Sequence, residues 1–415
     1  METDNSRHIL RVNICPGLYV SYNKESILKY TLFFTWAYIL LKYARAVFNR
    51  IPTLSDNIDA CIAVVVSIPI LLSLPAWINR FSIGDYLFYF INVFYLVACY
   101  AFFPENTAFL NEEIFYSVFC VFPFYFFGRL FSFHDFFDKL VYLSTICILL
   151  ELFYFLVYAQ QNKTVSEMAN DDNMWAAYQI MPHVALVMWS MLQRFRIWKA
   201  LIFVAGCLFL LSCGTRGTFV CMGFFGVIYF FFYMRFKGAI YVKAGIILAI
   251  ALTILTLEST LYYVVTTFTR LNLSTRIIEK LLLGDLGNDS HRSMLRDRLI
   301  QILDDGDYFW GFGAFGCRNF DIIYPHLLPL DFVCTFGYLL GSMLFAALCY
   351  LIIKAMWVTR GTKEQISIVF LFSLSIIKLL MSNTFLSEPY FYIFIGACCK
   401  ALLCNQRSKK PAIDA

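Results

Sequence analysis

The chain has 415 residues, of which 60% are hydrophobic and 19% aromatic, while only 15% are charged. Soluble domains carry about 25% charged residues, so this composition excludes an ordinary soluble enzyme and indicates a membrane protein. The net charge of +5 is modest and the basic residues lie mainly in short connections, which argues against a nucleic-acid partner.

Apolar runs of about 18 or more residues, separated by short charged connections, predict an all-α polytopic membrane protein with about twelve transmembrane helices. A transmembrane β-barrel is excluded because runs such as 203–211 and 246–257 show no two-residue alternation. The predicted spans are 27–48, 57–78, 86–103, 114–131, 140–159, 174–192, 199–213, 218–234, 244–265, 329–357, 366–382 and 389–404.

Three segments follow from these spans. Residues 1–265 hold the first nine helices, 266–328 form one long polar loop, and 329–415 hold the last three helices and a tail. Basic connections (193–199, 235–243, 359–363 and 407–410) alternate with acidic or neutral ones (104–113, 160–173 and 383–388). Basic connections stay on the cytoplasmic side, so we expect both termini inside and the long loop outside, in the periplasm of a bacterium.

The cysteines and the N-terminus give little information about function. No CxxC pair or Cys/His ligand spacing is present, so a metal site and a disulfide framework are weak interpretations. The N-terminus is polar up to about Lys24, and we expect no cleavable signal peptide. Most of the 14 cysteines lie inside spans, where a thiol behaves as a small apolar group; examples are Cys61, Cys99, Cys120, Cys147, Cys207 and Cys349.

The long loop is predicted to contain a helix over 290–303, capped by Ser290 and ended by Gly306. Arg292 and Arg296 are four residues apart, so they share one side of this helix. Its apolar face would consist of Met294, Leu295, Leu299, Ile302 and Leu303.

Arginines are the first candidates for binding a ligand. Arg216 lies in the outer turn 212–218, where it either reaches lipid headgroups or binds an anion beside backbone exposed by Gly214 and Gly217. Arg292, Arg296 and Arg298 could grip phosphate oxygens with forked guanidinium groups, although nearby aspartates could pair with them instead.

The glycine-rich stretch 311–316 lacks the Lys-Ser/Thr pair of a phosphate loop, so a tight turn is favoured. Its aromatic residues Trp310, Phe312 and Phe315 suit the edge of a bilayer, or could face sugar rings.

Histidine and lysine supply the remaining candidates. His326 precedes a span and could accept a proton from a hydroxyl at neutral pH, although a lone histidine is more often structural. His291 competes for the same role. His183 and Lys378 are ionisable residues inside spans, and either could simply pair within the bundle.

The order of these motifs resembles the superfamily of bacterial O-antigen polymerases and O-antigen ligases. An arginine in a short outer turn (214–217) is followed by Ser290-His291-Arg292 in a long outer loop, a Gly-x-Gly turn at 311–313 and Tyr324-Pro325-His326 before a span. Many members carry Asn directly after this histidine, whereas this chain has Leu327.

The resemblance implies a metal-independent, cofactor-free membrane glycosyltransferase of GT-C type in the inner membrane, using a glycan on undecaprenyl diphosphate. Arg216 and Arg292 match the diphosphate-binding arginines, with Arg296 matched less closely, and His326 matches the base that activates the acceptor hydroxyl. A chain-length regulator and a flippase of the same pathway are the expected protein partners.

Three functions remain open. A polymerase extends the glycan on a new lipid-linked unit, and a ligase transfers finished polymer to lipid A core with the same residues. The Tyr-Pro-His run and the stretch 307–313 favour the polymerase. A flippase or transporter would spread basic residues over many helices and often shows inverted repeats, whereas here they concentrate in one loop and no repeat is evident.

Overall fold

A computed structural model of the chain describes residues 9–15, 18–23, 81–130, 133–161, 165–213, 215–233, six positions between 262 and 269, 292–306 and 309–409. The predicted spans 27–48 and 57–78, most of 244–265, and the candidate His291 lie outside these residues. A short antiparallel hairpin, β1 (Ile9–Cys15) with β2 (Leu18–Asn23), is an exception to the all-α prediction within the described residues.

The first half of the described chain forms a series of helices joined by short connections. These are α4 (Ile83–Phe102), α5 (Thr107–Tyr116), α6 (Phe124–Leu130), α7 (Phe133–Gln161), α8 (Val165–Gln193), α9 (Ile197–Ser212) and α10 (Arg216–Ile228), which continues as the π-helix η3 (Tyr229–Tyr233). The predicted span 114–131 is divided among α5, the π-helix η2 (Ser117–Val121) and α6, because Pro123 has no amide hydrogen to continue the helix.

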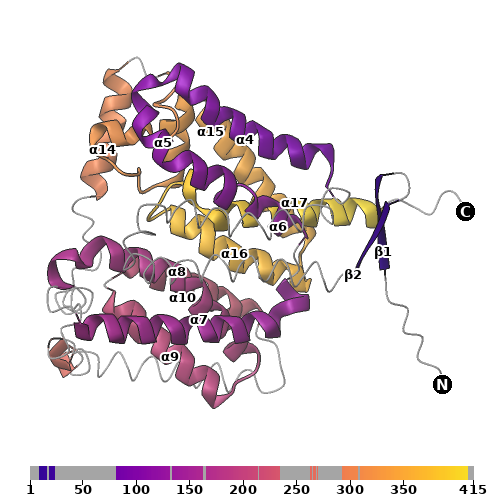
Figure 1. Cartoon of the computed structure of the whole chain (residues 1–415), viewed down its shortest axis with the longest axis vertical. Coiled ribbons are helices and arrows are strands. Elements are labelled where there is room, and N and C mark those ends of the chain that lie inside the picture. The colour runs from indigo at the N-terminus through magenta and orange to yellow at the C-terminus, as the bar shows by residue number, and fades with distance from the viewer. Residues whose placement is uncertain are drawn as a thin grey trace, which may run out of the picture.

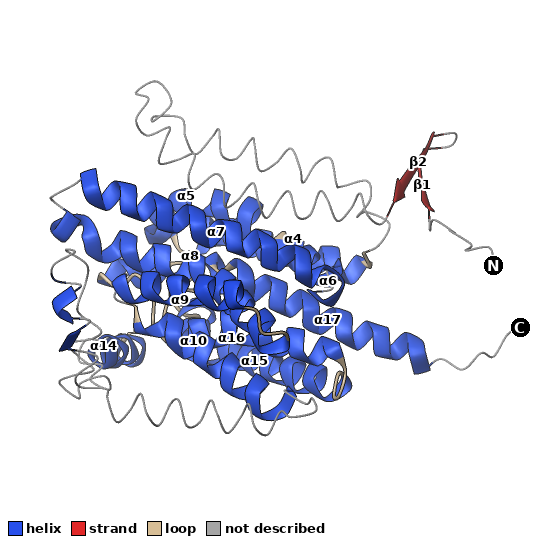
Figure 2. Ribbon diagram, turned by 90° about the horizontal axis from the view of Figure 1, so that it is seen from below, coloured by secondary structure: helices blue, strands red, loops and turns tan. Residues whose placement is uncertain are grey.

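The second half consists of α14 (Arg292–Asp305), α15 (Leu328–Val358), α16 (Lys363–Leu379) and α17 (Pro389–Lys409). In Figure 1, α16, α17 and α6 lie between a group formed by α4, α5 and α15 and a group formed by α7, α8, α9 and α10. Both views place α14 at one end of the bundle, running across the other helices, and the β1–β2 hairpin at the opposite end (Figures 1 and 2).

The central helices approach one another closely through glycine. A Cβ at Gly128 of α6 would collide with the Ile393 carbonyl of α17, and a Cβ at Gly396 of α17 would collide with the Tyr125 carbonyl of α6. Small residues at such crossings let two backbones pack in contact, which is the main source of helix association in a lipid environment.

Several helices match the predicted membrane character. Within the described residues, three are long and apolar enough to cross a membrane: α4, Arg216–Tyr233 and α15. These helices turn large apolar side chains outward, such as Phe94 (74% exposed) on α4 and Ile353 (67% exposed) on α15. Soluble proteins rarely expose such continuous apolar surface, so the helices are consistent with a membrane protein.

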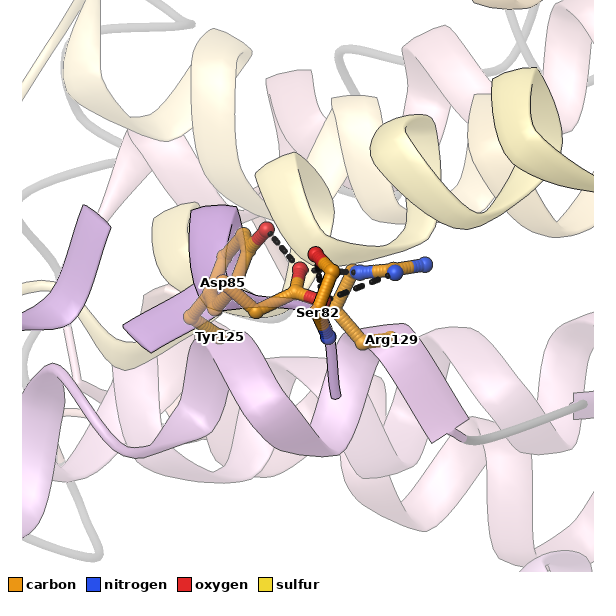
Figure 3. A network of polar contacts seen from close by, with 4 residues as sticks. All are labelled: Ser82, Asp85, Tyr125 and Arg129. Atoms are coloured by element: carbon orange, nitrogen blue, oxygen red, sulfur yellow. Dashed lines mark hydrogen bonds and ion pairs between the residues drawn. The ribbon is translucent and has the colours of Figure 1, made fainter. Parts of the chain in front are cut away.

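A buried ionic network joins α4 to α6 (Figure 3). The Asp85 carboxylate accepts hydrogen bonds from the Arg129 guanidinium at 2.6 and 3.0 Å, and from the Tyr125 hydroxyl at 2.6 Å. It also accepts one from the Ser82 backbone amide at 2.9 Å, which caps the start of α4. Every partner of the carboxylate is thus a donor, and the buried charge is balanced by Arg129.

We expect Arg129→Ala to lower the free energy of unfolding by about 3–5 kcal/mol, because it leaves the Asp85 charge buried without its counter-ion. Thermal unfolding of the detergent-solubilised protein measures the loss. The double variant Asp85→Asn/Arg129→Met removes both charges and should unfold closer to wild type. A double variant less stable than Arg129→Ala would contradict this electrostatic account.

Candidate functional site

The predicted loop helix is present as α14 (Arg292–Asp305) and ends before Gly306, as expected, while its predicted cap Ser290 lies outside the described residues. Leu299 and Leu303 are buried in a small second core with Phe312, Ile322 and Leu330. The prediction that Met294 belongs to the buried face is wrong, since this side chain is 58% exposed. At about 100° per residue Met294 points away from Leu303, whereas Leu295, the next residue, packs against this core.

The glycine-rich stretch forms a turn, as predicted. Gly311 and Gly313 have φ angles of 78° and 75°, which side chains disfavour. Phe312 is buried in the second core and Phe315 in the main core of the bundle, so neither is placed at the bilayer edge. Trp310 is 69% exposed, in agreement with an interfacial position, and packs edge-on against Phe309.

This turn is fastened to the segment after α4. The Asn106 amide donates hydrogen bonds to the carbonyls of Phe312 and Ala314 at 2.6 and 3.2 Å. The Arg318 guanidinium pairs with the Glu113 carboxylate at 2.6 Å. The loop is therefore held by residues from the opposite end of the sequence.

Helix α15 is interrupted at Gly337, where φ is 81° and ψ is 173°. The Phe309 carbonyl packs against this position so closely that a Cβ would collide with it. The residues before the break are mostly buried, and those after it mostly exposed. The interruption separates a short inner helix, which follows His326, from a longer apolar one.

His326 lies in the loop before α15 with a φ angle of 55°, a left-handed conformation that costs of order 1–3 kcal/mol for a side chain of this kind. Its Nδ1 lies 3.3 Å from the Met381 carbonyl oxygen. A carbonyl only accepts, so Nδ1 must carry the proton, and the basic nitrogen of the neutral ring is Nε2. The Tyr324 ring packs edge-on against the imidazole at 4.4 Å.

Arg216 is the first residue of α10, and Gly217 follows it directly. A Cβ at Gly217 would collide with the Tyr178 hydroxyl of α8, so the two helices are in contact beside Arg216. Tyr178 is buried, and it also interacts electrostatically with Arg292 of α14. Tyr178 therefore lies beside the start of α10, next to the position of Arg216, and close enough to Arg292 of α14 for an electrostatic interaction.

The connection between α16 and α17 contributes further residues beside Tyr178 and His326. Ser382 hydrogen-bonds to Tyr178 and lies 3.3 Å from the Tyr324 hydroxyl, while Met381 contacts His326. Tyr178, Ser382 and Tyr324 thus form a chain of contacts that reaches His326 and lies near Arg292 and beside Gly217, the neighbour of Arg216. The name Tyr178 cluster is used below for Tyr178, Tyr324, Ser382, His326, Arg216 and Arg292. Arg296 is half-buried on the next turn of α14.

A buried ion pair supports this cluster. The Lys378 ammonium pairs with the Glu388 carboxylate, which also accepts a hydrogen bond from the Asn383 amide at 2.9 Å. The same ammonium lies 5.1 Å from the centroid of the Tyr178 ring. Lys378 is therefore paired inside the bundle, which is one of the two roles foreseen for it. His183 likewise lies 3.0 Å from the Ser144 hydroxyl.

Sequence reasoning missed Tyr178, Ser382 and Glu388. Tyr178 and Ser382 are ordinary residues of apolar spans, and nothing in their local sequence marks them. Glu388 offered a signal, because it lies in the short connection that follows the span containing Lys378, and a lysine inside an apolar span needs an acidic partner nearby.

The chain matches no protein-family model, and comparisons with curated proteins and with solved structures find no significant match. Within the described residues no group of three or more His, Cys, Asp or Glu side chains has an arrangement that could hold a metal ion.

We expect Gly217→Ala to lower the melting temperature by several degrees, since the added methyl must push Tyr178 away from α10 at a cost of about 1–3 kcal/mol. Gly223→Ala on the same helix is the matched control, because a Cβ there meets no atom within 4 Å. That variant should be neutral or stabilising. Equal losses of melting temperature in both variants would show that the cost comes from substituting any glycine of α10, and would contradict a specific role for the Tyr178 contact.

Proposed function

We propose that this protein is an O-antigen polymerase of the inner membrane. It transfers a growing glycan from undecaprenyl diphosphate to a sugar hydroxyl of a new lipid-linked repeat unit, at the periplasmic face. The observation that supports the proposal is the Tyr178 cluster, in which Tyr178 lies beside Gly217, the neighbour of Arg216, interacts electrostatically with Arg292 and is linked through Ser382 and Tyr324 to His326.

The two arginines would bind the diphosphate from different helices. Guanidinium groups form paired hydrogen bonds with phosphate oxygens and stabilise the charge that develops on the departing lipid diphosphate. Arg296, one turn after Arg292, would extend this contact. The Lys378 charge is balanced by Glu388, so Lys378 is assigned to support rather than to the donor.

His326 would act as the base. Its Nδ1 hydrogen bond to the Met381 carbonyl leaves Nε2 as the proton acceptor, which would take the proton from the acceptor hydroxyl as oxygen attacks the anomeric carbon. The bond from that carbon to the diphosphate oxygen breaks, and the lipid diphosphate leaves. The reaction as proposed uses no metal or cofactor, in line with the GT-C type expected from the sequence.

The proposed orientation places both termini in the cytoplasm and α14 in the periplasm. The figures support it, because α14 and the hairpin near the N-terminus lie at opposite ends of the bundle. A chain-length regulator and a flippase of the same pathway are the proposed partners.

We expect Arg216→Ala, Arg292→Ala and His326→Ala each to abolish the long-chain lipopolysaccharide ladder in a complemented deletion strain, with unchanged protein level. Arg298→Ala is the matched control, since this arginine lies on α14 but is exposed, and it should restore the ladder. Full-length ladders from all three site variants would refute the assignment of these residues.

The deletion strain itself separates the alternatives. Core carrying a single repeat unit supports a polymerase. Undecorated core with accumulating lipid-linked polymer would identify a ligase, and lipid-linked single units trapped in the cytoplasmic leaflet would identify a flippase.

A topology measurement tests the orientation independently. We expect a cysteine at Ile323, an exposed position in the loop before α15, to react with an impermeant maleimide in intact cells above the wild-type background. A cysteine at Glu364, exposed at the start of α16, should react only after lysis. The reverse pattern would overturn the orientation.

A further inference from the structure

Two cysteines lie in contact beneath α14. Cys317 belongs to the short η4 helix (Gly316–Phe320), and Cys334 belongs to the inner part of α15. Both are buried members of the second core, and their thiols are within hydrogen-bonding contact. Both are free thiols in the structure.

The backbone around each thiol is also fixed. The Phe312 amide donates to the Cys334 carbonyl at 2.6 Å, and the Ile322 amide donates to the Cys317 carbonyl at 3.3 Å. The first bond holds the glycine-rich turn against α15 and the second fixes the loop around Cys317, so the two backbone segments that carry the thiols are held in place.

We infer that Cys317 and Cys334 form a disulfide in the mature protein, closing a covalent ring around the segment that carries Tyr324 and His326. The inference rests on the proposed function in one respect, the periplasmic location of this loop, because disulfides persist in that oxidising compartment.

The bridge has a physical purpose in this position. Asp321 and His326 both have positive φ angles, at 60° and 55°, and such conformations persist only where surrounding structure enforces them. A bond between residue 317, before this segment, and residue 334, after it, restricts the ring in every state of the loop. It would keep His326 beside Met381 when a bulky lipid-linked substrate enters.

The chemistry balances with an oxidising dithiol–disulfide protein of the periplasm as the electron acceptor. The thiolate of one cysteine attacks the disulfide of this protein, whose sulfur–sulfur bond breaks to give a mixed disulfide and one thiolate. The second cysteine then attacks the mixed disulfide and releases the oxidant as a dithiol. Two electrons and two protons leave the pair. Because both thiols are buried in the folded chain, exchange must precede packing of the loop on α15.

The test uses the full-length protein, taken from acid-quenched membranes and denatured in the presence of a light alkylating reagent. Reduction and labelling with a heavy form of the reagent follow. Trypsin cuts after Arg298, Arg318 and Lys354, so the two cysteines fall on different peptides, 299–318 and 319–354. Without reduction we expect these peptides linked, with a mass two hydrogens below their sum, and fragment ions that place the link at Cys334 rather than Cys349.

With reduction, Cys317 and Cys334 should carry the heavy label, while Cys221 on peptide 217–235 carries the light label as a buried control thiol. Light label on both Cys317 and Cys334 would overturn the inference.

Variants test what the bridge does. Cys317→Ala, Cys334→Ala and the double variant should all lower the melting temperature by the same amount. A reductant should lower the melting temperature of the wild-type protein but not that of the three variants. Additive losses in the single variants would overturn the bridging role in favour of separate packing roles. These readouts do not use polymer formation. A linked peptide in a protein that restores no ladder would support the disulfide and refute the polymerase. Free thiols in a protein that restores the ladder would refute the disulfide and support the polymerase.

Discussion

The ion pair between Lys378 and Glu388 is the interaction on which the candidate site depends. It closes the connection between α16 and α17, and Asn383 in that connection donates to the same carboxylate. The residues held there, Met381 and Ser382, contact His326 and Tyr324. Breaking a buried pair by removing one partner leaves an uncompensated charge in a medium of low dielectric constant. The connection therefore has one stable arrangement.

Glycine has a second role in the architecture, because it lets backbone approach backbone where a side chain would intervene. Gly128 and Gly396 bring α6 against α17, while Gly311 and Gly337 bring the loop against α15. The first contact builds the centre of the bundle. The second determines how the segment leading to His326 meets α15, so the site is positioned by main-chain packing as much as by side-chain bonds.

The helices and the loop helix could be predicted because apolar periodicity and turn residues are local signals. The predicted 290–303 helix and the spans matching α4, α8 and α15 follow from such signals. The burial of Phe312 and Phe315 could not be predicted, since Phe312 packs in a core shared with α14 and α15, and Phe315 packs in the main core of the bundle. Likewise, the position of Tyr178 beside the start of α10 and near Arg292 of α14 depends on the packing of three helices that are distant in sequence. The count of twelve spans stays a prediction.

The interruption of α15 at Gly337 also sets the length of the apolar helix that follows it. From Tyr338 to Val358 the helix has about 20 residues, or roughly 30 Å, which equals the hydrocarbon core of a bilayer. Tyr338 and Trp357 stand near its two ends, where aromatic side chains prefer the lipid headgroups. The inner helix and His326 are then held at headgroup level. A bilayer that is too thick or too thin would strain this match, so the height of the site above the hydrocarbon is tied to the lipid composition of the membrane.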